Sequence, residues 1–189
     1  MTALMLGRRG AVRPASETRA PSLILEETAV RHTRVGVREL GASDLTAVEK
    51  HLLELGPSDR RARFLCHPGD AAVTSYVQGI DLSVAVLVGA FDQSDRMVGL
   101  AEAHPSGTPY TVEIAVSIDP VLRRRGLGQR LVARALALAF DRGMRSAEFV
   151  FAPTNRALAG LVRALGGRIT APGHALIDHS ADLVQRVSV

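Results

Sequence analysis

An alternating segment that runs through an Arg/Gly-rich turn into a helical pattern constrains the fold of this chain more than any other feature. Over residues 110–118, apolar side chains occupy every second position, which predicts a half-buried strand. From Leu127 onward, apolar residues recur at helical spacing until Asp141-Arg142-Gly143, where Gly143 can end the helix. Between the two patterns lies Arg123-Arg124-Arg125-Gly126-Leu127-Gly128-Gln129-Arg130. The sequence therefore predicts a strand, a tight turn and a helix in direct succession.

The turn has the composition of an anion-binding site. Gly126 and Gly128 allow the backbone to approach a ligand closely, and the first N–H groups of the helix point into the turn. The three arginines that precede them add charge-assisted donors suited to phosphate. The chain has no Gly-x-Gly-x-x-Gly after this strand and no Gly-Lys-Ser/Thr of a P-loop. We therefore predict a cradle for a pyrophosphate.

The same stretch resembles the acyl-CoA signature of the GNAT N-acetyltransferase superfamily. The resemblance rests on Val112-Glu113-Ile114-Ala115-Val116-Ser117-Ile118-Asp119-Pro120, followed by Arg123-x-x-Gly126-x-Gly128. It implies an acetyltransferase with acetyl-CoA as acyl donor, the pyrophosphate in the turn and the pantetheine arm beside the end of the strand. The residues that it places at the coenzyme are Val116, Ser117, Ile118, Arg123, Arg124, Arg125, Gly126, Leu127, Gly128, Gln129 and Asn155.

Asn155 has two compatible interpretations. It matches the family's asparagine at the start of a later helix, which contacts the coenzyme. Asparagine is also a common helix N-cap, and Asn155 precedes a helical stripe that contains Leu158, Leu161 and Val162. The sequence does not choose between the two roles.

The order of the predicted elements favours an α/β (α+β) protein with the GNAT fold, in which helices flank a central mixed, mostly antiparallel sheet. Residues 1–29 lack a period and are predicted to be a flexible extension, and residues 30–189 a single domain. Strands are predicted at 30–40, 84–91, 97–103, 110–118, 147–151, 168–170, 175–177 and 183–187. Helices are predicted from a Ser43 cap to 55, at 58–65, at 71–78, from 127 to the 141–143 turn, and at 155–165.

Composition narrows the class of protein further. The chain of 189 residues is 47% hydrophobic but only 4% aromatic, so its core must be aliphatic. A single cysteine, Cys66, excludes an internal disulfide and any zinc site built on cysteines. No apolar run is long enough to span a bilayer, and no signal-peptide pattern follows the N-terminal arginines, so we predict a cytoplasmic protein with no membrane partner.

The positive charge does not favour nucleic-acid binding. The net charge is +4 and the isoelectric point is about 10.2. However, the arginines are spread along the chain and lack interleaved aromatic residues on which bases could stack. An acidic protein surface, or the phosphates of the coenzyme, would account for part of this charge.

The reaction that the resemblance implies requires a base and no metal ion. A thioester is already activated, so the acceptor amine must only be neutral, close and aligned. Glu113 is the predicted general base, because it lies on the signature strand a few residues before the cradle. Its alternative role is a solvated carboxylate paired with an arginine. Glu102 and Glu148 are weaker candidates for the base, and His104 is predicted to be an exposed turn residue.

A looser resemblance concerns the acceptor. Residues 55–65 resemble a segment of the bacterial protein lysine acetyltransferases, although Arg61 and Leu65 replace aromatic residues of that segment. Many family members have a tyrosine that protonates the leaving thiolate at the position where this chain has Val162. We therefore predict a protein lysine on an acidic surface as acceptor, with a small-molecule amine or a non-catalytic acyl-CoA-binding regulatory module as alternatives.

Overall fold

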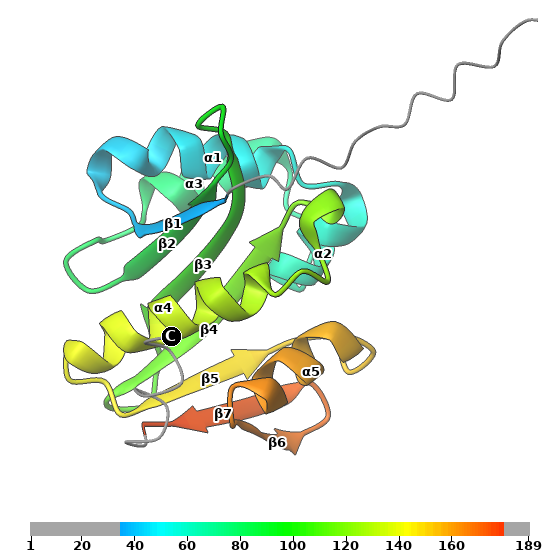
Figure 1. Cartoon of the computed structure of the whole chain (residues 1–189). Coiled ribbons are helices and arrows are strands. Elements are labelled where there is room, and N and C mark those ends of the chain that lie inside the picture. The colour runs from blue at the N-terminus through cyan, green and yellow to red at the C-terminus, as the bar shows by residue number, and fades with distance from the viewer. Residues whose placement is uncertain (1–34, 180–189) are drawn as a thin grey trace, which may run out of the picture. The chain divides into compact units, whose positions relative to one another are not determined.

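The computed structural model describes residues 35–179, and within them seven strands form one sheet in the order β1-β2-β3-β4-β5-β7-β6 (Figure 1). All neighbouring strands are antiparallel except β4 and β5, which are parallel. The prediction of a mixed, mostly antiparallel sheet flanked by helices is confirmed. The strands are β1 (Gly36–Glu39), β2 (Val86–Phe91), β3 (Met97–Pro105), β4 (Thr111–Ile118), β5 (Ser146–Val150), β6 (Arg168–Ala171) and β7 (His174–Asp178).

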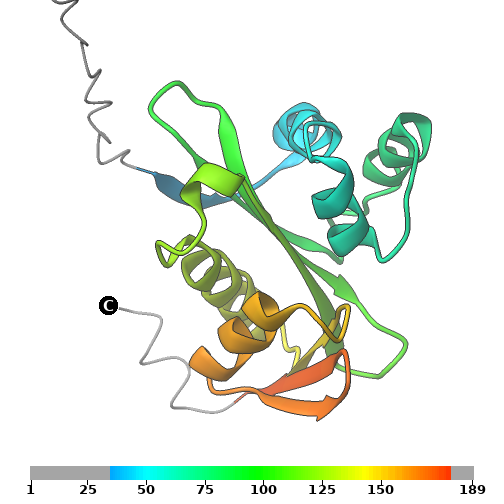
Figure 2. The ribbon, with the colours of Figure 1, turned by 90° about the vertical axis from the view of Figure 1, so that its right-hand side faces the viewer.

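Helices cover the two faces of the sheet in two groups (Figure 2). The helices α1, α2 and α3 lie on one side, and α4 and α5 lie on the other. Their bounds are α1 (Leu45–Leu53), α2 (Pro57–Phe64), α3 (Asp70–Gln78), α4 (Leu127–Asp141) and α5 (Arg156–Ala164), with short 3-10 turns η1 (Ala42–Asp44) and η2 (Pro120–Leu122). Between the end of β4 and the start of α4, the chain passes only through η2 and the Arg/Gly turn.

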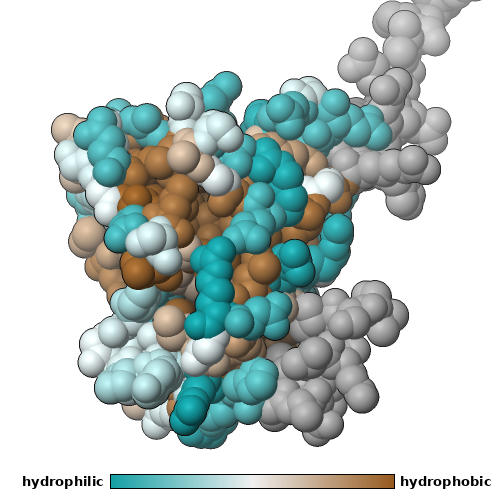
Figure 3. Space-filling model, turned by 90° about the vertical axis from the view of Figure 1, so that its left-hand side faces the viewer, coloured by the Kyte–Doolittle hydropathy of each residue, from teal (hydrophilic) through white to brown (hydrophobic). Residues whose placement is uncertain are grey.

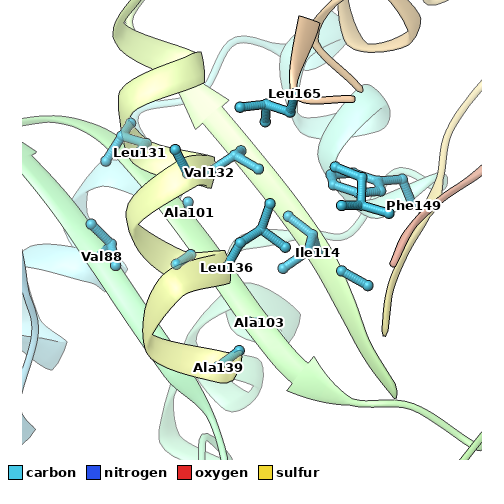
Figure 4. Close-up of a cluster of buried hydrophobic side chains, with 14 of the residues drawn as sticks. Val88, Ala101, Ala103, Ile114, Leu131, Val132, Leu136, Ala139, Phe149 and Leu165 are labelled. Atoms are coloured by element: carbon cyan, nitrogen blue, oxygen red, sulfur yellow. The ribbon is translucent and has the colours of Figure 1, made fainter. Parts of the chain in front are cut away.

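The larger core is aliphatic, as the composition predicts. Leu131, Val132 and Leu136 of α4 project onto Ala101 of β3 and Ile114 of β4 (Figure 4). All five side chains are buried, with at most 2% of their surface exposed. Small residues on β3 allow α4 to lie close to the sheet, and Phe149 adds the bulk that fills the space towards α5. This packing holds the first turn of α4 in a defined position.

A second core on the opposite face holds the first three helices. Leu52 of α1 and Val73 and Val77 of α3 pack with Leu87 and Leu100 of the sheet. A space-filling view of one side shows hydrophobic residues gathered in its middle, with hydrophilic residues above and below them (Figure 3). Among the helices that the structure describes, none is long and apolar enough to cross a membrane.

The predicted elements agree with the structure apart from two local differences. Ser43 does not cap a helix, because it lies inside η1 and the Asp44 carboxylate accepts the Gly41 N–H at 2.9 Å. Strand β3 continues to Pro105, so His104 lies in the sheet and not in a turn. The predicted extension at 1–29, the start of the first strand and the strand at 183–187 lie outside the described residues.

Candidate functional site

The first turn of α4 presents backbone donors without a side-chain cap. Its N-cap is Gly126, whose φ of 78° places it in the left-handed region that glycine tolerates. The Arg130 N–H donates to the Gly126 carbonyl at 3.1 Å, which closes the first helical turn. Within residues 35–179, the N–H groups of Leu127, Gly128 and Gln129 therefore have no acceptor one turn earlier. Such a group of N–H donors can bind an anion.

The three arginines of the turn differ in what they contact. Arg123 donates from Nε to the Ile118 carbonyl at 3.0 Å, and its Nη2 lies 2.8 Å from the Asp59 carboxylate of α2. It therefore joins the turn to α2. Arg124 and Arg125 are exposed, and Arg124 adopts a φ of 63°. These two guanidinium groups remain at the surface of the turn, where they can meet a phosphate.

Gly128 has a different role from the one that the turn composition suggests. A Cβ at this position would stand 2.9 Å from Ile118 Cδ1 and 3.0 Å from Leu161 Cδ1. Gly128 is buried, and the space beside it is filled by protein. Its missing side chain is therefore explained by close packing of α4 against β4 and α5. A Cβ there would have to displace the ends of these two side chains, so a substitution at Gly128 acts first on the packing of α4.

Strands β4 and β5 pair over only part of the length of β4. The parallel register runs from Thr111↔Ser146 to Glu113↔Glu148, whereas β4 continues to Ile118. The two strands therefore separate beyond Glu113, on the side where the α4 turn lies. An edge of β4 is left without a strand partner in the described chain.

The antiparallel ladder shows which backbone groups this edge presents. The Asp119 N–H donates to the Val98 carbonyl at 2.9 Å, so Asp119 and every second residue before it point their backbone groups towards β3. The backbone groups of Val116 and Ile118 point the other way, towards the separation between β4 and β5. The Ile118 carbonyl already accepts a hydrogen bond from Arg123. Val116 is therefore the residue of this edge whose N–H and carbonyl are both available to a ligand.

Ser117 is engaged within the protein. Its Oγ lies 2.9 Å from His51 Nε2 of α1, and both side chains are buried. Burial lowers the pKa of His51, so the imidazole is kept neutral. The side chain of Ser117 therefore anchors α1 to β4, and only its neighbours present free backbone groups to a ligand.

Asn155 caps α5. Its Oδ1 accepts the Leu158 N–H at 3.1 Å, as an N-cap side chain does. The structure therefore confirms the helix-capping role of Asn155. Because the cap uses only the side-chain oxygen, the side-chain N–H groups can still donate to a ligand. Contact with a coenzyme stays a prediction.

Three titratable side chains lie in a row across the face opposite α4. The register pairs His104 of β3 with Glu113 of β4, and Glu113 with Glu148 of β5. Paired residues in a sheet project to the same face with Cβ atoms about 5 Å apart. Glu113 is exposed and has no hydrogen-bond or ion-pair partner among the described residues. Its carboxylate is accordingly free to accept a proton from a bound molecule.

Glu102 lies on the same face, two residues before His104, but it is completely buried. Arg63 of α2 donates to its Oε1 from Nε at 3.2 Å and from Nη2 at 2.5 Å. Tyr76 of α3 donates to Oε2 at 2.5 Å, and His104 Nε2 lies 3.1 Å from the same oxygen. Burial alone would raise the pKa of Glu102, but Arg63 and the hydrogen bonds outweigh it and lower the pKa. A carboxylate held ionised in this way is a poor base.

From the sequence, Arg60, Arg61 and Arg63 were predicted to face an acidic partner on the acceptor side, which is wrong for Arg63, because its side chain is only 8% exposed and pairs with Glu102. Tyr76 and His51 were not predicted as parts of this region. Arg63 follows an ordinary helical pattern, and no local signal shows that its charge is buried beneath α2. Arg60 also contacts mostly the protein and not solvent, since it donates to the Leu53 carbonyl and the Asp70 carboxylate, both at 2.6 Å. Of the arginines in α2, Arg61 alone is exposed and without a partner among the described residues.

A family model matches residues 60–166, more than half of the chain, and its description is the acetyltransferase (GNAT) family. The chain belongs to the GNAT acetyltransferase family. It is accordingly an acyltransferase. The match begins inside α2 and ends just after α5, so it includes the α4 turn, the separation of β4 from β5 and the Glu113 row.

Solved structures agree with this assignment at the level of the fold. The GNAT domain of PAT from S. lividans is 17% identical with a TM-score of 0.62, over 76% of this chain and 89% of that one. A phosphinothricin acetyltransferase from Sinorhizobium meliloti, solved in complex with AcCoA, is 19% identical with a TM-score of 0.62, over 76% and 88%. A putative acetyltransferase from Salmonella typhimurium with its cofactor acetyl-CoA is 17% identical with a TM-score of 0.60, over 79% and 98%.

Proposed function

We propose that the protein transfers an acetyl group from acetyl-CoA directly to a primary amine. One observation carries the proposal: the uncapped first turn of α4 lies beside the edge of β4 that separates from β5. The free edge of β4 can bind the extended pantetheine arm of the coenzyme, and the α4 turn that follows it along the chain can bind the pyrophosphate. Two of the similar structures hold acetyl-CoA, which supports this ligand for the present chain.

The residues of the site have separate tasks in this reaction. The N–H groups of Leu127, Gly128 and Gln129 bind the pyrophosphate, with help from Arg124 and Arg125. When bound, the thioester supplies an acyl group that is already activated. The Val116 N–H donates to the acetyl oxygen and stabilises the negative charge that develops there during transfer.

The acceptor must lose a proton before it can attack. A lysine-type amine has a pKa of about 10.4, so its deprotonation at pH 7 costs about 4.6 kcal/mol. Glu113 is exposed and has no ion-pair partner within residues 35–179, and it accepts this proton directly or through water. The amine nitrogen then attacks the acetyl carbon, and the bond from that carbon to sulfur breaks. The attacking nitrogen loses its second proton, which passes to the sulfur through water, so the coenzyme leaves as a thiol.

The proposed acceptor is a lysine side chain of a protein. The resemblance of residues 55–65 to the protein lysine acetyltransferases supports this choice, and exposed Arg61 can face an acidic surface. A small-molecule amine is the second candidate, because Glu113 and Glu148 are register neighbours on one face and would attract a compact cation.

Acetylation of a whole-cell protein extract, read by mass spectrometry beside a panel of small amines, tests the function and its acceptor together. Lysine acetylation that requires the enzyme and acetyl-CoA would support a protein acceptor. Turnover of a polyamine or an aminoglycoside without protein labelling would select the second candidate. Tight acetyl-CoA binding without release of free thiol on any amine would contradict catalysis at this site.

Glu113→Gln is the sharpest single test of the mechanism. The substitution keeps the shape and removes the basicity, so turnover should fall about 10²- to 10⁴-fold, the usual contribution of a positioned base. Affinity for acetyl-CoA should stay close to that of the wild type. Full activity of Glu113→Gln at pH 7 would exclude Glu113 as the base.

A further inference from the structure

We infer that His104, oriented by the buried carboxylate of Glu102, is a relay residue that takes up the proton collected by Glu113 and passes it to solvent. This inference rests on the proposed function, because it requires that an amine loses a proton at Glu113. It starts from the hydrogen-bond network of Arg63, Tyr76, Glu102 and His104 on the face opposite α4.

The donors and acceptors of this network allow one placement of its protons. Arg63 can only donate, and its Nη2 lies 2.9 Å from the Tyr76 oxygen as well as 2.5 Å from Glu102 Oε1. The Tyr76 hydroxyl donates to Glu102 Oε2 at 2.5 Å, and an ionised carboxylate can only accept. His104 Nε2, at 3.1 Å from both Glu102 Oε2 and the Tyr76 oxygen, must therefore carry a hydrogen.

This tautomer leaves the Nδ1 atom of neutral His104 with a free lone pair. A carboxylate that accepts the N–H of one ring nitrogen fixes the tautomer, orients the ring and stabilises the imidazolium that forms when the other nitrogen takes up a proton. Glu102 is 0% exposed, so its charge is not screened by water from the imidazole beside it.

His104 is more exposed than Arg63 and Glu102, and it lies on the strand next to the proposed base. Its side chain is 30% exposed, compared with 8% for Arg63 and 0% for Glu102. The register places it directly opposite Glu113. A carboxylate and an imidazole on adjacent strands of one face can exchange a proton directly or through one water molecule.

The proton balance of the relay is complete. The acceptor ammonium loses H⁺ to the Glu113 carboxylate, and the carboxyl group then loses H⁺ to His104 Nδ1, which restores the carboxylate. The imidazolium releases H⁺ to solvent through its exposed edge. The charged and titratable groups that face the imidazole are Glu102, Tyr76 and Arg63 in the network, and Glu113 with Glu148 in the row.

Two substitutions separate the relay from a purely structural role. His104→Gln provides an amide N–H in place of Nε2–H, so it can keep the bond to Glu102 without accepting a proton. His104→Ala leaves a partly open space that free imidazole can enter. His67, an exposed histidine of the loop between α2 and α3, gives the matched control His67→Ala.

The assay follows thiol release from acetyl-CoA with a short lysine peptide at saturating acetyl-CoA, together with thermal unfolding and acetyl-CoA affinity of each variant. We expect both His104 variants to fold, to bind acetyl-CoA as the wild type does and to lose turnover on the order of 10²-fold. Added imidazole should restore part of the activity of His104→Ala and none of that of His104→Gln. The rate of His67→Ala should stay unchanged with and without imidazole.

Wild-type activity in His104→Gln would overturn the relay and leave the network a structural role alone. Failure of imidazole to rescue a folded His104→Ala would overturn it as well. These outcomes are distinct from failure of the proposed function, because Glu113→Gln measured in the same assay would still lose its turnover. If Glu113→Gln and both His104 variants were all fully active, the base itself would be misassigned.

Discussion

Gly128 at the start of α4 lies so close to Ile118 at the end of β4 that a Cβ atom on Gly128 would stand 2.9 Å from Ile118 Cδ1. Leu161 of α5 closes the other side at 3.0 Å. The helix therefore approaches the strand so closely that a side chain on Gly128 would have to displace the ends of the Ile118 and Leu161 side chains.

We expect Gly128→Val to lower the free energy of unfolding by about 1–3 kcal/mol, the usual cost of overpacking a core. Urea denaturation monitored by circular dichroism measures it. Gly160→Ala in α5 is the matched control, because a Cβ there meets no atom within 4 Å. An unchanged midpoint in Gly128→Val would show that the helix can move away without cost.

Gly126→Ala should weaken binding of acetyl-CoA. No atom of the described residues lies within 4 Å of a Cβ at this position, so the methyl group would enter the open space beside the α4 turn. We expect Kd to rise at least about tenfold by calorimetry, and the left-handed φ of 78° to cost about 1–2 kcal/mol of stability. Gly143→Ala, with a φ of 89° at the other end of α4, should lose similar stability and keep its Kd. Equal Kd values for both variants would argue against the cradle.

Arg63→Met should destabilise the protein far more than its helical position suggests. The substitution leaves the Glu102 carboxylate charged, fully buried and without a cation, which typically costs about 3–5 kcal/mol. Adding Glu102→Leu should recover much of that loss, since it removes the isolated charge. The exposed pair Lys50–Glu54 is the control, and Lys50→Met should change stability by less than about 1 kcal/mol. Equal losses from Arg63→Met and Lys50→Met would contradict the buried ion pair.

Asp44 should contribute to acid unfolding. The hydrogen bonds from Arg38, at 2.7 and 2.8 Å, are the main reason that the pKa of Asp44 is lowered to about 2. A carboxyl group whose folded pKa lies below its unfolded pKa of about 3.9 stabilises the protein above that value and loses the effect as pH falls towards 2. Asp44→Asn should therefore be less stable than the wild type at pH 7, and the difference should shrink between pH 4 and pH 2. A constant difference in unfolding free energy across that range would refute this account.

Arg60 and Arg61 should respond differently to charge reversal. Arg61→Glu should leave stability within about 0.5 kcal/mol and slow the acetylation of an acidic protein at low salt, because its guanidinium faces solvent. Arg60→Glu should destabilise the fold, since it removes the bonds to the Leu53 carbonyl and to Asp70. Kinetics at two salt concentrations and thermal melts of both variants measure these effects. Identical kinetics in Arg61→Glu and the wild type would remove the support for an acidic partner surface.

Most of the helices and strands could be predicted from the sequence, because each has a local period and a recognisable end. Gly143 ends α4 with a positive φ, and Gly166 follows α5 in the same conformation, as a helix C-terminal glycine does. The alternation over residues 110–118 similarly predicted β4. Ser43 was wrongly predicted as the N-cap of the first helix, since Asp44 stands at that position and its carboxylate accepts from Arg38 and the Gly41 N–H.

The strand, the Arg/Gly turn and the helix of the cradle follow from the sequence alone, because those three features depend on neighbouring residues. What surrounds them depends on three-dimensional packing. Packing showed that Gly128 lies against the side chain of Ile118 and that Arg63, far along the chain from Glu102, neutralises the Glu102 carboxylate. Burial and long-range register set the charge of a carboxylate and the partner of a histidine, and no local pattern encodes either of them.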